Sequence, residues 1–152
     1  MTSRFLSPWL TVRVQFVLAA FFVVAGASKI ADPPGFAHEI HNYGLVPGVA
    51  VNAMALILPW LELVAGVALF LGIAKRTATR ILGLLLLVFI VAFSINLARG
   101  RPVDCGCFGT SKVQKTESQR LFDMKVAIAR DVGLLILAAQ ILAAAREEAR
   151  HR

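Results

Sequence analysis

Apolar residues gather in four long stretches of the chain, and polar residues fall between them. The first three stretches cover about 9–30, 49–73 and 81–98, and the third has no charged residue in its 18 positions. A helix needs about 20 apolar residues to cross the hydrocarbon core of a bilayer. The pattern therefore predicts an all-α protein built from membrane-spanning helices.

The fourth apolar stretch is shorter, and it brings charged residues towards the membrane. Only 14 uncharged residues run from Val132 to Ala145. They make about 21 Å of helix, against a hydrocarbon core of about 30 Å. A spanning helix must therefore begin near residue 126 and include Arg130 and Asp131. With a fourth span at about 126–145, the sequence predicts an integral membrane four-helix bundle.

Two polar segments connect the predicted spans on one side. Between the first and second spans, Phe36, Ile40 and Tyr43 recur at helical spacing within "PPGFAHEIHNYGLVPG" (33–48). This spacing predicts a short helix that lies in the membrane interface. Between the third and fourth spans, we expect a loop at about 99–125.

The composition fits a membrane protein of one domain, 1–152. The chain is 58% hydrophobic with a mean hydropathy of +0.73. Its net charge is +7, but no nucleic-acid motif accompanies the basic residues, which flank the apolar stretches. We therefore expect contacts with the lipid bilayer and none with nucleic acid. Arg4 and Arg13 before a short apolar core, followed by "AGA" (25–27), also fit a cleaved signal peptide.

The orientation in the membrane depends on the basic residues of the loops. An even number of spans places both termini on one side, and the side richer in Lys and Arg faces the cytoplasm. Each side holds eight such residues, namely Arg4, Arg13, Lys75, Arg76, Arg80, Arg146, Arg150 and Arg152 against Lys29, Arg99, Arg101, Lys112, Lys115, Arg120, Lys125 and Arg130. Because three basic residues are packed into "AKRTATR" (74–80), we expect cytoplasmic termini in the inner (plasma) membrane.

The two cysteines of the chain, Cys105 and Cys107, lie together in "GRPVDCGCFGTSK" (100–112). An extended chain puts the Cα atoms of such a pair near the upper limit of about 6.8 Å for a disulfide, and Gly106 can supply the bend. The ring so formed is small and strained, which favours a labile, oxidising disulfide over a stabilising one. Pro102 ends the third span just before the pair, so we expect both thiols close above the membrane surface.

The neighbouring charges act on thiolate formation in opposite directions. Arg99, Arg101 and Lys112 favour the thiolate, whereas Asp104 opposes it. A redox role is the interpretation we favour, and a structural clip is the alternative. A metal site formed with His38 and His41 is a further alternative, although neither C-x-C nor H-x-x-H is a usual zinc spacing. We therefore expect no metal.

Glu62 is the most unusual residue of the apolar stretches. It lies in "LILPWLELVAG" (56–66), about 16 Å from the inner end of its span and thus near the membrane midplane. A carboxylate there is costly and indicates a functional site by default. Because Arg130 falls about one helical turn higher by the same counting, we expect it to pair with Glu62, directly or through water. A protonated or merely paired carboxylate is the alternative.

Further expectations concern the surroundings of Glu62. Pro59 should kink the second span and help form a polar pocket in which a quinone could bind, although no cofactor is required. Asn96 should hydrogen-bond across the bundle. Lys29 should extend its ammonium group to the lipid head groups.

Three stretches together resemble the MauE/DoxX family of redox-associated membrane proteins, most closely its methylamine utilisation protein MauE branch. They are "AGASKIADPPGFAHEIHNYGLVP" (25–47), "PWLELVAGVALFLG" (59–72) and "NLARGRPVDCGCFG" (96–109). The resemblance covers about 14–145, and its most specific residues are Cys105, Gly106, Cys107, Phe108 and Gly109, with Glu62 as a secondary match.

The resemblance implies a helical membrane protein that acts beside thioredoxin-like partners. In methylamine-utilising bacteria it implies a part in the maturation of methylamine dehydrogenase, whose small subunit needs many disulfides. Combined with the residues, it favours a thiol–disulfide oxidoreductase that acts on a thioredoxin-like partner or an exported client. The alternatives are a membrane scaffold or chaperone whose cysteines clip a loop, and a Cys/His metal-binding protein.

Overall fold

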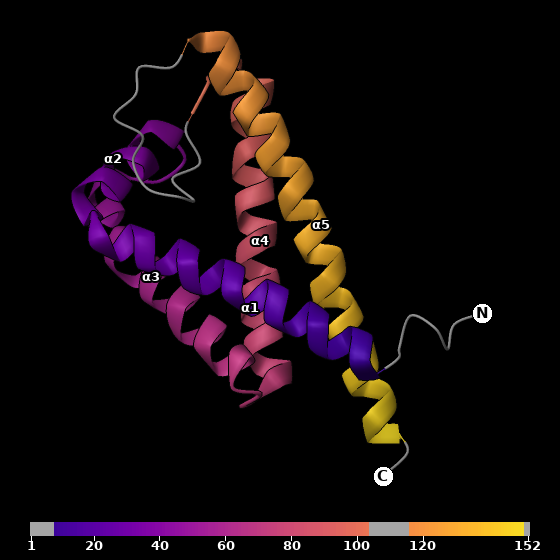
Figure 1. Cartoon of the computed structure of the whole chain (residues 1–152). Coiled ribbons are helices and arrows are strands. Elements are labelled where there is room, and N and C mark those ends of the chain that lie inside the picture. Colours follow the sequence, from indigo (N-terminus) through magenta and orange to yellow (C-terminus); the bar gives the residue numbers. More distant parts are fainter. Residues whose placement is uncertain (1–7, 104–115, 151–152) are drawn as a thin grey trace.

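The computed structural model describes residues 8–103 and 116–150, which form α-helices and, within these ranges, no strand. The helices are α1 (Pro8–Ala31), α2 (Pro33–Tyr43), α3 (Gly48–Phe70), α4 (Lys75–Ala98) and α5 (Glu117–Arg150) (Figure 1). Among the described residues, four helices are long and apolar enough to cross a membrane, namely α1, α3, α4 and α5. The predicted all-α membrane bundle is confirmed.

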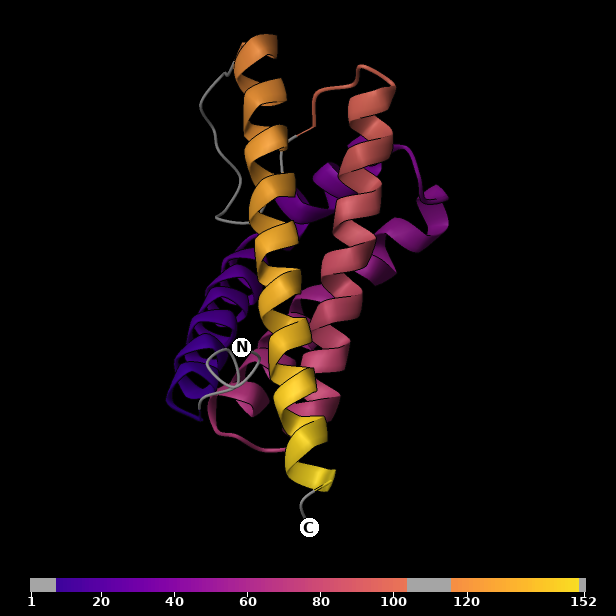
Figure 2. The same cartoon turned by 90° about the vertical axis from the view of Figure 1, so that its right-hand side faces the viewer.

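The four long helices form two neighbouring pairs. Helix α1 lies along α3, and α4 lies along α5, while the short α2 sits at the end of the bundle where α4 ends and α5 begins (Figures 1 and 2). The central core is apolar and includes Leu18, Phe22, Leu69, Leu82, Leu86 and Ile141. Large apolar side chains such as Trp60, Leu84 and Ile136 are exposed on the outside. Helices that are apolar on all faces are typical of membrane spans.

Small residues allow α1 and α3 to approach closely. A Cβ atom added to Gly26 would lie 2.8 Å from the carbonyl oxygen of Pro59, and one added to Gly66 would lie 3.1 Å from the backbone nitrogen of Val23. Glycine at such contacts is a common packing device in membrane helices. Helix α3 continues through Pro59, which is buried.

The short helix between the first two spans is present as predicted. Asp32 caps α2 by accepting a hydrogen bond from the backbone N–H of Gly35 at 3.1 Å, and the helix ends at Gly44 with a φ of 60°. Its apolar face, with Phe36, Ile40 and Tyr43, is buried against the protein. Helix α2 is therefore packed onto the bundle by the side that the sequence marked as apolar.

Two helices begin before the spans that hydropathy predicts, and the predicted loop is therefore too long. Helix α4 begins at Lys75 rather than at residue 81, and α5 begins at Glu117 rather than at 126, so 117–125 is not part of a loop. Hydropathy locates the apolar part of a helix, whereas both helices continue into polar sequence. At 34 residues, α5 is about 51 Å long and exceeds a core of about 30 Å.

The early start of α5 has a local cause. Thr116 Oγ1 accepts a hydrogen bond from the N–H of Gln119 at 3.4 Å, and Gln119 Oε1 accepts one from the N–H of Thr116 at 3.0 Å. This reciprocal pair is a capping box, which satisfies donors that a helix start leaves open. The motif is readable in the sequence as "TESQ".

Candidate functional site

A buried ion pair joins the end of α1 to the middle of α3. Lys29 Nζ lies 2.8 and 2.7 Å from the two carboxylate oxygens of Glu62. The two side chains are only 4% and 1% exposed. The expectation that Lys29 reaches the lipid head groups was therefore wrong, and so was the expectation that Glu62 pairs with Arg130. Lys29 turns inward because the carboxylate is within its reach and a buried charge needs a partner.

Aromatic rings complete the surroundings of the ammonium group. Lys29 Nζ lies 4.9 Å from the centroid of the Phe89 ring on α4 and 5.1 Å from that of Phe36 on α2. A cation at this distance from a ring is attracted by the ring quadrupole, and the attraction grows where water is excluded. Lys29 thus contacts three other helices through one carboxylate and two rings.

A second ion pair lies within α5. Arg130 Nε and Nη2 donate to Asp131 Oδ1 at 2.9 and 2.8 Å. The side chain of Asp131 is 4% exposed and that of Arg130 is 25% exposed. The guanidinium also lies 4.9 Å from the centroid of the Phe21 ring on α1. Arg130 is therefore satisfied by its neighbour in sequence and by an aromatic ring of another helix.

Both ion pairs border the same small gap, which is also lined by Phe21, Phe22, Ala25, Leu86 and Phe89. All four spans contribute to this region, whose charge cluster we define as Lys29, Glu62, Arg130 and Asp131. The gap has a volume of about 10 Å³, and a single water needs about 10–15 Å³. The gap is therefore no larger than a single water molecule.

The charge cluster carries two positive and two negative groups, so its formal charges cancel. This balance is what allows four ionisable side chains to lie inside apolar helices. The sequence does contain a signal that Lys29 belongs to the cluster, although we predicted a different position for its ammonium group. Lys29 follows Phe22 and Ala25 at spacings of seven and four residues, and these two residues are on the buried face of α1.

Asn96 is fully buried near the end of α4. Its Nδ2 donates to the carbonyl of Ala92 at 3.0 Å, one turn earlier in the same helix. Its Oδ1 has no hydrogen-bond partner among the described residues. The expected hydrogen bond across the bundle is thus not found in the described part of the chain.

The predicted redox residues Asp104, Cys105, Gly106, Cys107, Phe108 and Gly109 lie outside the described residues, which stop at Val103 and resume at Thr116. Hydrogen bonds hold the segment 101–103 against the bundle. The N–H of Arg101 donates to the carbonyl of Asn96 at 3.0 Å. Val103 is buried, and its N–H donates to the sulfur of Met124 on α5 at 3.3 Å.

An open recess lies at this end of the bundle, with a volume of about 850 Å³. It is lined by Pro34, Gly35, His38, Glu39, Asn42, Gly100, Arg101, Pro102, Val103 and Arg120. Within the described residues, no group of three or more His, Cys, Asp or Glu side chains is arranged to hold a metal ion. The alternative Cys/His metal site includes Cys105 and Cys107, so it falls outside the described part.

Four apolar helices around a neutral charge cluster define a multi-pass α-helical membrane protein. A family model described as "Methylamine utilisation protein MauE" matches residues 7–144. The chain belongs to this family, and the resemblance inferred from its motifs is confirmed. No solved structure matches the chain significantly.

Several curated proteins that are similar to this chain carry the same name. The chain is 34% identical to "Methylamine utilization protein MauE" of Methylorubrum extorquens over 71% of this chain and 59% of that protein. The values for the Paracoccus denitrificans protein of the same name are identical. A Paracoccus versutus protein of that name is 34% identical over 85% of this chain and 68% of its own length. The chain thus spans about three fifths of the length of the first two relatives.

Proposed function

We propose that this protein exchanges disulfides at the extracytoplasmic face of the inner (plasma) membrane, with Cys105 and Cys107 as the redox pair. The observation that carries the proposal is the position of these cysteines in the chain. They follow, by two and four residues, the buried Val103, which is fixed against α5 at the end of the bundle that also holds the open recess. The partner is a thioredoxin-like protein or an exported client.

The exchange is balanced within the two proteins. A thiolate of the partner attacks one sulfur of the Cys105–Cys107 disulfide, and a mixed disulfide forms while the other sulfur leaves as a thiolate. A second thiol of the partner then displaces the bound cysteine. Two electrons pass to this protein, its two cysteines take up two protons, and the partner gains a disulfide. The reverse sequence of steps reduces the partner.

The positions of two basic residues support cytoplasmic termini. Lys29 and Arg130 are held in ion pairs within the spans and do not act as loop charges. Without them, the count of Lys and Arg is eight on the side of the termini against six on the other. Helix α5 ends at Arg150, at the opposite end of the bundle from the end of α4, which Arg99 and Arg101 follow (Figure 1). The positive-inside rule then favours an outward-facing cysteine segment.

Membership of the family supports a role in methylamine utilisation. The curated relatives are named as methylamine utilization proteins. An exported enzyme of the methylamine-dehydrogenase type, whose maturation requires disulfides, is a client that fits both the name and the outward-facing cysteines.

The test is the reduction potential of the cysteine pair in the purified, full-length protein, equilibrated in glutathione or dithiothreitol buffers. A reversible value well above about −300 mV is expected for an exchanging pair. Cys105→Ser and Cys107→Ser should each abolish release of the oxidised client. A much lower potential, with client maturation unchanged in both variants, would instead favour a scaffold with a structural clip.

A further inference from the structure

The open recess is built by three separate elements. Helix α2, the segment 100–103 and the first turn of α5 supply its walls. Its volume of about 850 Å³ lies in the range of about 300–1,000 Å³ that is typical of pockets for drug-sized ligands. The recess is thus large enough for several side chains of another molecule.

The walls of the recess are held in place by contacts in the bundle. Phe36 of α2 packs against the ammonium group of Lys29, and the rings of Tyr43 and Phe93 meet edge to face with centroids 5.6 Å apart. On the other side, Val103 is held by Met124. A binding site whose walls are already fixed loses little entropy when a partner enters.

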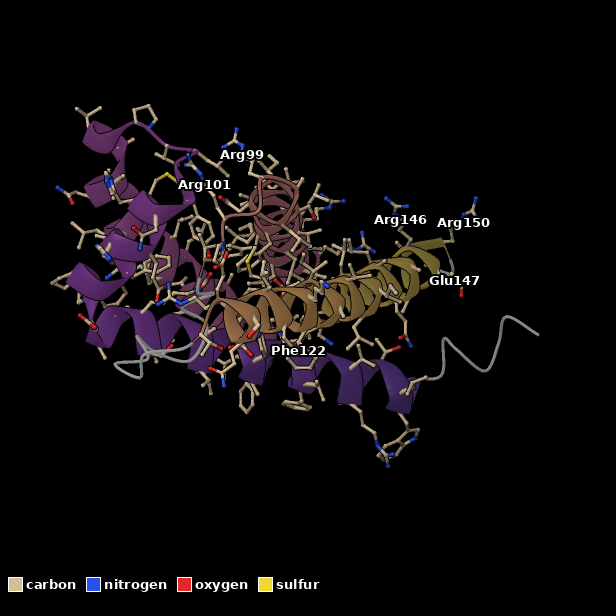
Figure 3. The ribbon with its side chains drawn as sticks, turned by 90° about the horizontal axis from the view of Figure 1, so that it is seen from above. Arg99, Arg101, Phe122, Arg146, Glu147 and Arg150 are labelled. Carbon is tan, nitrogen blue, oxygen red and sulfur yellow. The ribbon has the colours of Figure 1, made fainter. Side chains whose placement is uncertain are left out.

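The exposed surface of the recess is rich in hydrogen-bond donors and carries a positive charge. His38, Asn42 and Arg101 are exposed, whereas the carboxylate-bearing Glu39 is only 8% exposed. Arg101 extends from the end of α4 towards α2. Its Nη1 lies 3.5 Å from the position that a Cβ atom would take on Gly44, the residue that ends α2. Figure 3 shows Arg101 and Arg99 at this same end of α4. A molecule that enters meets the guanidinium before it meets the carboxylate.

We infer that the recess receives an acidic polypeptide segment that flanks the reactive cysteine of the partner, with Arg101 binding its carboxylates. This inference rests on the proposed function, because the partner's sulfur must reach the cysteine pair. Cys105 follows Val103 by two residues, a distance of at most about 7 Å along the chain. A peptide fits better than a small anion because Asn42 and His38 add hydrogen-bonding groups that suit backbone amides.

The test compares two peptides, each with a single cysteine flanked by four Asp or by four Lys residues. The oxidised full-length protein is held in a neutral detergent, and mass spectrometry follows formation of the mixed disulfide with each peptide. Each rate is divided by the rate of the same peptide with neutral hydroxyethyl disulfide, because flanking charges also change the reactivity of the thiol itself.

The acidic peptide should react about 3–10 times faster at low ionic strength, and the advantage should shrink as salt is added. Arg101→Glu should abolish or reverse this advantage. The matched control is Arg99→Glu, which changes an exposed arginine two residues away that does not line the recess. This control should keep most of the advantage.

Two results would overturn the inference while the proposed function stands. One is exchange of both peptides at equal normalised rates. The other is an effect of Arg99→Glu as strong as that of Arg101→Glu, which would assign the preference to the overall field. A third result would overturn the proposed function itself. The small neutral thiol 2-mercaptoethanol is tested beside the peptides. If neither the peptides nor this thiol exchanges with the protein, the proposed function fails and the inference fails with it.

Discussion

The ammonium group of Lys29 binds both carboxylate oxygens of Glu62, at 2.8 and 2.7 Å, although 33 residues separate the two in the chain. The pair fixes the end of α1 against the middle of α3, in surroundings where water is excluded from both charges. The same ammonium contacts Phe36 of α2 and Phe89 of α4. The ion pair and the two ring contacts of its ammonium group therefore connect four helices. The pair also explains how a carboxylate is accommodated inside an apolar span.

The Lys29–Glu62 pair predicts a strong coupling between substitutions. Lys29→Met or Glu62→Met alone leaves one buried charge without its partner, which costs about 3–5 kcal/mol of stability. The double variant removes both charges and should be much closer to the original protein. The measurement is the free energy of unfolding of all four forms in detergent, combined as a double-mutant cycle.

Arg130→Met serves as the comparison for this cycle. Arg130 is bound to Asp131 rather than to Glu62, so it should not rescue Glu62→Met. If the effects of Lys29→Met and Glu62→Met simply add, or if Arg130→Met rescues Glu62→Met instead, the assigned pairing is wrong.

Replacing glycine by alanine should have opposite effects on stability at Gly26, in the contact between α1 and α3, and at Gly133 in α5. Gly26→Ala places a methyl group 2.8 Å from the carbonyl oxygen of Pro59, and relief of such a clash should cost about 1–3 kcal/mol. Gly133→Ala in α5 meets no atom within 4 Å and should add about 0.5–1 kcal/mol through helix propensity. Thermal unfolding in detergent measures both, and equal effects would contradict the close approach at Gly26.

Hydropathy and spacing were sufficient to predict the spans and the short helix α2, because burial in lipid or protein requires apolar side chains on regular faces. They did not predict where α4 and α5 begin, because a capping box and polar turns extend these helices beyond their apolar stretches. The "TESQ" box at 116–119 carried that information in the sequence. Local capping therefore needs to be considered separately from hydropathy.

The partner of Glu62 was harder to predict than its importance. Counting turns along straight helices placed Arg130 beside it, but a side chain as long as that of lysine reaches several ångströms from its own backbone. Lys29 also lies at the edge of its apolar stretch, where extension towards the head groups is the usual outcome. The deciding signal was its place on the buried face of α1, in line with Phe22 and Ala25.

Helix α1 should remain in the mature membrane protein. Cleavage after "AGA" (25–27) would remove Leu18 and Phe22 from the central core and Gly26 from its contact with α3. An epitope tag placed before α1 should therefore stay with the membrane-bound protein in immunoblots and in intact-mass spectra. A membrane fraction that consists of the shortened, untagged chain would contradict this prediction.

The orientation can be tested with reporters at the two ends of the bundle. A green fluorescent protein fused after α5 should fluoresce, because it folds in the cytoplasm, whereas alkaline phosphatase at the same place should be inactive.

Replacing Lys75, Arg76 and Arg80 by Gln lowers the count of Lys and Arg on the side of the termini from eight to five, against six on the other. The bias is then lost, and a mixed orientation should appear, with both reporters partly active. Arg99→Gln is the control and should leave the orientation unchanged, because it lowers the count on the other side from six to five, against eight. Strong phosphatase activity in the unchanged protein would place the cysteine segment in the cytoplasm and would contradict the proposed exchange with exported clients.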